Sequence, residues 1–172
     1  LCLALHDLGK LFRVADVAAA ASIEALTGTD SVFAAELHAI RPHPGQAASA
    51  ANMAKVLAGS GLIQRPTSGE FTRVQDAYSL RCSPQVHGAA RDTAAHAASV
   101  AAIELRSAID NPVVLDDGRV ESNGNFHGAP VGYVLDFLAI AVADVASISE
   151  RRTDRFLDTA RNHGLPPFLA AD

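Results

Sequence analysis

The chain has 172 residues, a formal net charge of −5 and a composition that is 49% hydrophobic, which is enough for one domain with a sizeable core. Its 14 basic residues are scattered along the sequence rather than gathered in a stripe, so we expect no nucleic-acid partner. The two cysteines, Cys2 and Cys82, lack a zinc-ligand spacing and predict neither a disulfide framework nor a zinc site, so we expect a reducing, cytoplasmic location.

The first half of the chain is predicted to contain two helices. Apolar residues recur at helical spacing from Leu1 to a break at 27–30, where the sequence reads TGTD. A Pro-containing loop at 41–46 leads into a second helix, which should end near Gly59 to Gly61. The stretch 61–74 is polar and contains Gly and Pro, so we predict a loop there.

A long helix is predicted to begin at Ser83, whose side chain is expected to cap it, with Pro84 at the first helical position. No Gly or Pro interrupts the sequence from Ala89 onward, so the helix should continue to Asp110. The Asn-Pro pair at 111–112 should then end it.

The remainder is predicted to form a small β-hairpin near 113–122 and one more long helix, from about Pro130 to beyond Arg152. The apolar part of that helix contains only two charged residues, Asp136 and Asp144, and carries apolar side chains on every face. A helix of this kind is buried on all sides, so we expect neighbouring subunits or further segments to cover it, and no membrane. The expected fold class is all-α, a bundle of long helices with one small hairpin.

The densest group of polar side chains lies at 74–82, in the sequence VQDAYSLRC. An arginine just before a helix, beside tyrosine and glutamine, suits the binding of a small carboxylate. The guanidinium of Arg81 can hold both oxygens, while Tyr78 and Gln75 supply hydrogen bonds or proton transfer. The alternative is that Arg81 and Asp76 pair with each other and only tie down a loop. Local chemistry balances these two interpretations evenly.

A second polar stretch, SNGNFHGAP, occupies 122–130. Its glycines flank Asn125, Phe126 and His127 and allow the backbone to turn sharply. Such a turn can present an aromatic side chain at the start of the last helix, or it can be an ordinary connection.

The histidines do not predict a metal site. His6 and Asp7 look like the metal-binding pair of HD-type phosphohydrolases, but a divalent site needs further ligands, so a surface or capping role is favoured. His87 and His96 are nine residues apart and would lie on roughly opposite faces of a helix. We therefore expect no metal.

Several stretches occur together in an order and spacing that resemble the histidine ammonia-lyases, within the wider family of aromatic amino acid ammonia-lyases and aminomutases. The resemblance covers essentially the whole chain and is carried by SIEALTGTDSVF, IRPHPGQ, VQDAYSLRCSPQVHGAARD, AIDNPVV, ESNGNFHGAPVGYVLDFLAIAVAD, SERRTDR and HGLPPFL. It implies the non-oxidative elimination of ammonia from L-histidine to give trans-urocanate, the first step of histidine degradation. It also implies an α-helical homotetramer in which three subunits build each active site. Action on tyrosine or phenylalanine, or a non-catalytic helical assembly module, are the alternatives.

The resemblance also implies roles for individual residues. Arg81 would hold the substrate carboxylate, and Tyr78 would assist proton traffic or position the amine beside the family's electrophile. Gln75 would form hydrogen bonds in the same pocket, and Phe126 would pack against the electrophile and the substrate ring.

The electrophile of the family, 4-methylidene-imidazol-5-one, forms from an internal Ala-Ser-Gly tripeptide, which does not occur in 1–172. The resemblance implies that this tripeptide lies upstream, together with the catalytic tyrosine base. We therefore expect residues 1–172 to be part of the central helical domain of a longer lyase, truncated at both ends, and to be inactive alone.

Overall fold

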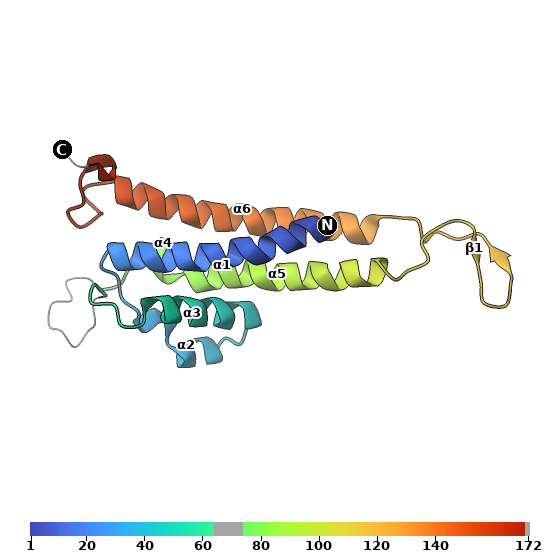
Figure 1. Cartoon of the computed structure of the whole chain (residues 1–172), viewed down its shortest axis with the longest axis horizontal. Helices are drawn as coiled ribbons and strands as arrows, with labels where there is room; N and C mark the ends of the chain where they lie inside the picture. Colours follow the sequence, from blue (N-terminus) through green and yellow to red (C-terminus); the bar gives the residue numbers. More distant parts are fainter. Residues whose placement is uncertain (64–73, 171–172) are drawn as a thin grey trace.

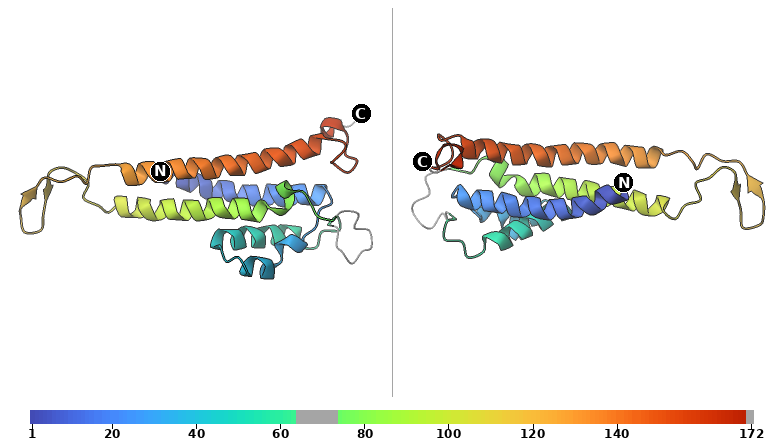
Figure 2. Two further views of the ribbon diagram at one scale, coloured as in Figure 1. Left: turned by 180° about the vertical axis from the view of Figure 1, so that it is seen from behind. Right: turned by 45° about the horizontal axis from the view of Figure 1, so that its top comes forward.

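A computed structural model describes residues 1–63 and 74–170 as long helices lying side by side, with a hairpin projecting from one end (Figures 1 and 2). The long helices are α1 (Cys2–Ala25), α3 (Pro44–Leu57), α5 (Ser83–Glu104) and α6 (Ala129–Leu157). Helix α5 packs against the other three. The short elements are η1 (Ser31–Phe33), α2 (Ala35–Ala39), α4 (Tyr78–Arg81) and η3 (Pro167–Leu169).

The predicted hairpin is present. Strands β1 (Val113–Val114) and β2 (Val120–Glu121) pair antiparallel, with Val113 opposite Glu121. Gly118 lies in the turn with a φ of +83°, which a residue with a side chain rarely adopts. The all-α fold class with one small hairpin is therefore confirmed.

Most predicted helix limits are confirmed, because strong local signals set them. Helix α1 ends at Ala25, one residue before the TGTD break, and Thr27 has a positive φ of 49°. Helix α3 begins at Pro44, so the proline lies in its first turn. The helix ends at Leu57, close to Gly59. Most of the loop predicted for 61–74 lies outside the described residues.

Helix α5 begins at Ser83 with Pro84 in its first turn, as predicted, but the predicted cap and the predicted end are wrong. The Ser83 hydroxyl does not cap the helix but donates a hydrogen bond to the Ser79 carbonyl at 3.1 Å. The helix ends at Glu104 rather than at Asp110. Side chains compete for the last carbonyls of the helix. Ser107 Oγ donates to the Ile103 carbonyl at 2.8 Å, and Arg106 Nε donates to the Ala102 carbonyl at 2.9 Å. Such local hydrogen bonds favour termination over continuation.

Close contact between α3 and α5 depends on two glycines. A Cβ atom on Gly88 would lie 2.3 Å from the backbone nitrogen and Cα of Gln46, and one on Gly45 would lie 2.2 Å from the Gly88 carbonyl oxygen. The Gly45 amide donates to Asp92 Oδ1 at 2.8 Å, so a carboxylate on α5 caps the first turn of α3. Backbone contact and capping together fix how these two helices pack.

The apolar core has two parts. One lies where the C-terminal part of α1 meets α3 and α4, and its largest members are Ile23, Leu26, Phe33, Met53, Leu57, Ile63 and Leu80. The other lies between α1, α5 and α6, with Leu8, Phe12, Ala97, Val134, Leu138 and Val145. The α4 turn is thus anchored in the core by Leu80, while its neighbours in sequence reach the surface.

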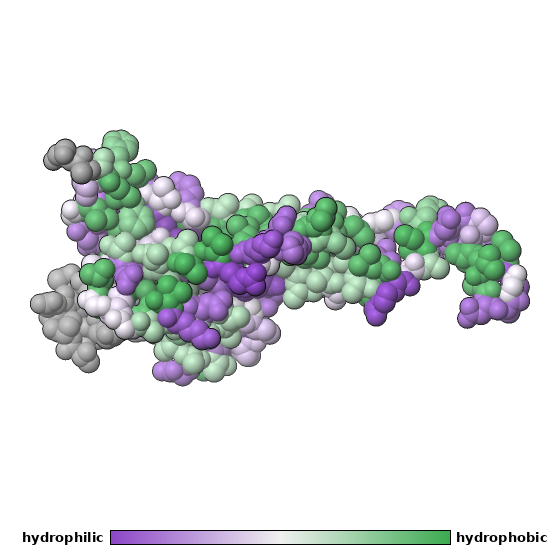
Figure 3. Space-filling view, in the orientation of Figure 1, coloured by the Kyte–Doolittle hydropathy of each residue, from purple (hydrophilic) through white to green (hydrophobic). Residues whose placement is uncertain are grey.

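Within this chain, helix α6 is buried on one side only, and its coverage by neighbouring subunits or further segments stays a prediction. Tyr133, Phe137 and Ile140 are 75%, 49% and 69% exposed, because among the described residues the elements that mainly pack against α6 are α1, α4, α5 and η3. Figure 3 shows apolar residues over the exposed face of the bundle. By length and composition alone, α6 could also cross a membrane, as many core helices of soluble proteins could.

Candidate functional site

Tyr78 and Arg81 stack on each other in the short helix α4. The central guanidinium carbon of Arg81 lies 4.6 Å from the centre of the Tyr78 ring, a cation–π contact. Arg81 Nε donates to the backbone carbonyl of Asp76 at 2.9 Å. Within 1–63 and 74–170, this is the only hydrogen bond of the Arg81 guanidinium, so its two outer nitrogens can engage a ligand.

The alternative interpretation, an Arg81–Asp76 ion pair that ties down the loop, differs from the observed contacts. Oxygen Oδ2 of Asp76 accepts a hydrogen bond from the backbone amide of Thr29 at 2.8 Å. Asp76 is buried, and its carboxylate therefore joins the loop to the segment after α1. The backbone of Asp76, rather than its side chain, orients Arg81.

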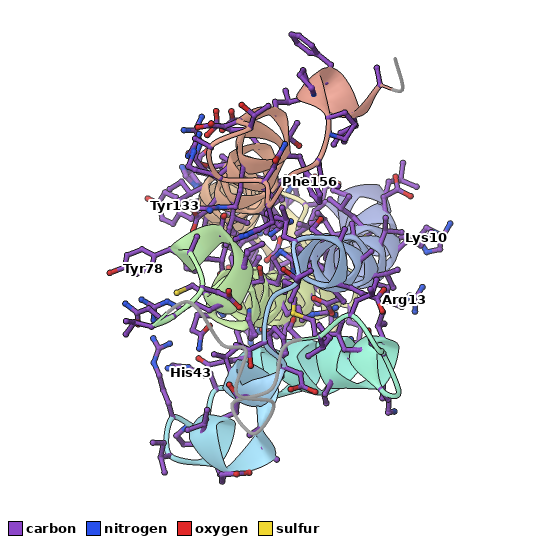
Figure 4. The ribbon with its side chains drawn as sticks, turned by 90° about the vertical axis from the view of Figure 1, so that its left-hand side faces the viewer. Lys10, Arg13, His43, Tyr78, Tyr133 and Phe156 are labelled. Atoms are coloured by element: carbon purple, nitrogen blue, oxygen red, sulfur yellow. The ribbon has the colours of Figure 1, made fainter. Side chains whose placement is uncertain are left out.

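The Tyr78 ring is 72% exposed and points away from the bundle (Figure 4). It lies at a hollow of about 490 Å³ between α4 and α6, which Cys82, Val86 and Ile148 also line. Gln75 is exposed three residues earlier and makes no hydrogen bond to Tyr78 or Arg81. The structure therefore brings Tyr78 and Arg81 together, and no hydrogen bond joins Gln75 to either of them.

Phe126 lies far from this pair. It is 62% exposed in the turn before α6, at the hairpin end of the bundle, whereas α4 packs near the opposite end of α6 (Figure 1). Helix α6 has 29 residues, and a rise of 1.5 Å per residue makes it about 40 Å long. A single copy of this chain cannot place Phe126 and Tyr78 in one pocket.

Hydrogen bonds shape the turn around Phe126. The Asn125 amide donates to Asn123 Oδ1 at 2.8 Å, and the Ala129 amide donates to His127 Nδ1 at 3.2 Å. Asn125 and His127 thus hold the turn that leads into α6. This agrees with a turn-shaping role for both residues and leaves the Phe126 ring open to solvent.

A buried charged network, which the sequence analysis missed, lies at the centre of the bundle. Asp16 accepts hydrogen bonds from Asn52 at 2.8 Å and from Arg91, and its Oδ1 lies 2.9 Å from His87 Nδ1. Burial, the largest single influence, would raise the pKa of Asp16, but hydrogen bonds from His87 and Asn52 together with Arg91 hold it below its ordinary value. The signal in the sequence was Asp16 itself, four residues after Phe12 on the buried face of α1.

The contacts of this network join helices to one another, which indicates a structural role. Arg91 also donates to Ser49 Oγ and to the Phe12 carbonyl, each at 2.9 Å, so it joins α1, α3 and α5. His6 and Asp7 are exposed on α1, and within the described part of the chain no group of three or more His, Cys, Asp or Glu side chains could hold a metal.

Comparison with known proteins gives consistent matches over the whole chain. A family model described as aromatic amino acid lyase matches residues 1–172. Histidine ammonia-lyase of Streptomyces coelicolor is 70% identical over 100% of the chain, which covers 33% of that protein. Histidine ammonia-lyase of Caldanaerobacter subterraneus is 48% identical over 98% of the chain, covering 32% of that protein. The chain thus spans about a third of the length of these curated relatives.

Solved structures match the fold as well as the sequence. Tyrosine aminomutase from Streptomyces globisporus superposes with a TM-score of 0.89 at 37% identity, over 98% of this chain and 35% of its own. Histidine ammonia-lyase from Trypanosoma cruzi superposes with a TM-score of 0.85 at 38% identity, over 98% of this chain and 30% of its own.

Proposed function

Because this chain belongs to the aromatic amino acid lyase family, we propose that it is a segment of a histidine ammonia-lyase that converts L-histidine to trans-urocanate and ammonia. The observation that carries the proposal is the stacked pair of Tyr78 and Arg81, whose guanidinium retains free outer nitrogens within the described part of the chain. The high identity to histidine ammonia-lyases favours histidine as the substrate.

The chemistry of the two side chains suits the first requirement of this reaction, which is to hold a free amino acid in one orientation. The outer nitrogens of Arg81 would donate two parallel hydrogen bonds to the α-carboxylate. This contact places the amine and the β-carbon beside Tyr78, whose phenol would position the amine or pass a proton, with Gln75 adding a hydrogen bond. The elimination then breaks one C–H and the C–N bond, forms the carbon–carbon double bond and releases ammonia.

The separation of Phe126 from Tyr78 supports a site built from several copies of the chain. Phe126 can pack on the substrate ring only if a second copy presents its hairpin end to the α4 end of the first. The exposed apolar side chains of α6, including Tyr133 and Phe137, supply a surface for such association. A cytoplasmic homotetramer with three subunits at each site, without nucleic acid or membrane, is part of the proposal.

The family's electrophile would be 4-methylidene-imidazol-5-one, which when present activates the substrate for loss of a weakly acidic proton and a poor leaving group. Residues 1–172 contain no Ala-Ser-Gly from which it could form. The chain's own residues therefore fit substrate binding but not formation of the electrophile. In this proposal, residues 1–172 belong to the central helical domain of the longer enzyme.

The alternative substrates are tyrosine and phenylalanine. They need to be tested because the chain is also similar to a tyrosine aminomutase. The decisive experiment supplies the full-length protein with each of the three amino acids and follows the near-ultraviolet absorbance of the product. Turnover of L-histidine in preference to both others is the expected result. Preference for tyrosine or phenylalanine would show that histidine is not the substrate. No turnover of any of the three would favour a non-catalytic assembly module.

A further inference from the structure

Arg152 on α6 is 3% exposed, yet it has no carboxylate partner in 1–63 and 74–170. Burial lowers its pKa to about 10, which means that its surroundings oppose the charge. Burying a charge without a counter-ion costs free energy, so the hydrogen bonds of the guanidinium must offset part of that cost. Nη1 donates to the Ser79 carbonyl at 3.2 Å and to Ser83 Oγ at 3.1 Å.

Both acceptors belong to the junction of α4 and α5. Ser83 Oγ donates in turn to the Ser79 carbonyl, so three groups from α4, α5 and α6 form one closed set of hydrogen bonds. Ser79 directly follows Tyr78 and lies two residues before Arg81. Helix α4 has only four residues, too few to be stable by itself, so contacts from outside must hold its orientation.

The neighbouring charges on α6 behave differently. Arg151, 60% exposed in its side chain, pairs with Glu150, and Asp154 pairs with Arg161. Nearby carboxylates are therefore engaged at the surface, while Arg152 alone points inward to a backbone carbonyl of α4. A residue that served only the charge balance of α6 would join these surface pairs instead.

We propose that Arg152 is a positioning residue, which fixes the α4 turn against α6 and so sets the direction of Tyr78 and Arg81. As a statement about catalysis, this inference rests on the proposed function. As a statement about α4, it can be tested without any activity. Helix α6 begins directly after the turn that carries Phe126. Arg152 therefore fixes α4 to the helix whose other end carries the predicted contact with the substrate ring.

The first test is amide hydrogen exchange in the full-length protein. Arg152→Met should accelerate exchange at the amides of Leu80, Arg81 and Cys82 by about ten-fold, because loss of one hydrogen bond from a charged donor corresponds to that factor. The matched control is Arg151→Met, which removes an exposed guanidinium one residue earlier and should leave these amides unchanged. No change at α4 in Arg152→Met would overturn the inference, as would an equal acceleration throughout α1 and α3.

The second test separates positioning from general stability in the steady-state kinetics. Displacement of Arg81 should raise KM, and displacement of Tyr78 should lower kcat, so Arg152→Met should reduce kcat/KM at least about ten-fold through both. Arg152→Lys keeps a charged donor and should retain more activity than Arg152→Met. A lower amount of folded protein with unchanged KM would show a structural role only and would contradict the inference.

Two further results keep the outcomes distinct. If Arg152→Met does not fold, Ser83→Ala removes one of the two acceptors with little loss of volume, and it must accelerate exchange at the same α4 amides for the inference to hold. If the wild-type protein has no lyase activity but Arg152→Met still loosens α4, the proposed function fails while the placement of α4 by Arg152 stands.

Discussion

Oxygen Oδ1 of Asp16 lies 2.9 Å from Nδ1 of His87, and both side chains are fully buried although 71 residues separate them in the chain. The carboxylate is an acceptor only, so the hydrogen lies on Nδ1. His87 Nε2 is buried and has no partner within 1–63 and 74–170. This contact, together with Arg91, connects the helices on which the α4 turn is built.

Replacement of His87 by alanine should destabilise the protein by about 2–4 kcal/mol, because it leaves a cavity and removes a hydrogen bond from a buried carboxylate. Urea denaturation measures the change. His96→Ala is the matched control, since His96 is exposed on the same helix and its loss should cost less than about 0.5 kcal/mol. Equal effects of the two substitutions would contradict a buried network.

The depressed pKa of Asp16 predicts a loss of stability in acid. Asp16 contributes fully above its ordinary pKa of 3.8, and the contribution disappears as the pH falls from there through the lower folded value. The free energy of unfolding should therefore fall more steeply with acidification below about pH 4 in the wild type than in Asp16→Asn. Parallel pH profiles of the two proteins would show that Asp16 is not the group responsible.

Gly88→Ala should destabilise the protein by about 3 kcal/mol, because the new methyl group would meet the backbone of Gln46 and force α3 away from α5. Thermal unfolding detects such a change. Gly9→Ala provides the control, since nothing lies within 4 Å of the added atom and alanine favours a helix by about 0.5–1 kcal/mol over glycine. A similar Tm for both variants would disprove the close contact.

Arg81→Lys should lower kcat/KM for the amino acid at least about ten-fold, because an ammonium group cannot hold both carboxylate oxygens as a guanidinium does. The assay is product absorbance in the full-length protein. Arg13→Lys on the exposed face of α1 makes the same exchange far from α4 and should have no effect (Figure 4). An unchanged rate and KM in Arg81→Lys would remove the carboxylate role.

Residues 1–172 produced alone should release no ammonia from L-histidine. The segment contains no Ala-Ser-Gly, and within one copy Phe126 and the α4 turn lie toward opposite ends of α6. An ammonia assay at high protein concentration tests this, with the full-length protein as the positive control. Turnover by the isolated segment would refute the need for the missing tripeptide.

The order and type of the long helices and of the hairpin followed from local signals in the sequence, whereas the short helices α2 and α4 were not predicted. Pro44 in the first turn of α3, the TGTD break after α1 and the residues around Gly118 each act over a few positions, so neighbours in the chain suffice to predict them. The 74–82 stretch was likewise recognisable as a possible binding group, because Gln75, Tyr78 and Arg81 lie close together in an otherwise apolar sequence.

Only the tertiary structure decided which distant groups meet. Packing of α1 on α5 made Asp16 and His87 partners, and packing of α6 on α4 directed Arg152 to the Ser79 carbonyl. The same packing placed Phe126 at the far end of the bundle from Tyr78. Local propensity carries no information about such contacts, because their free energy depends on burial and on geometry between helices that are separated by tens of residues.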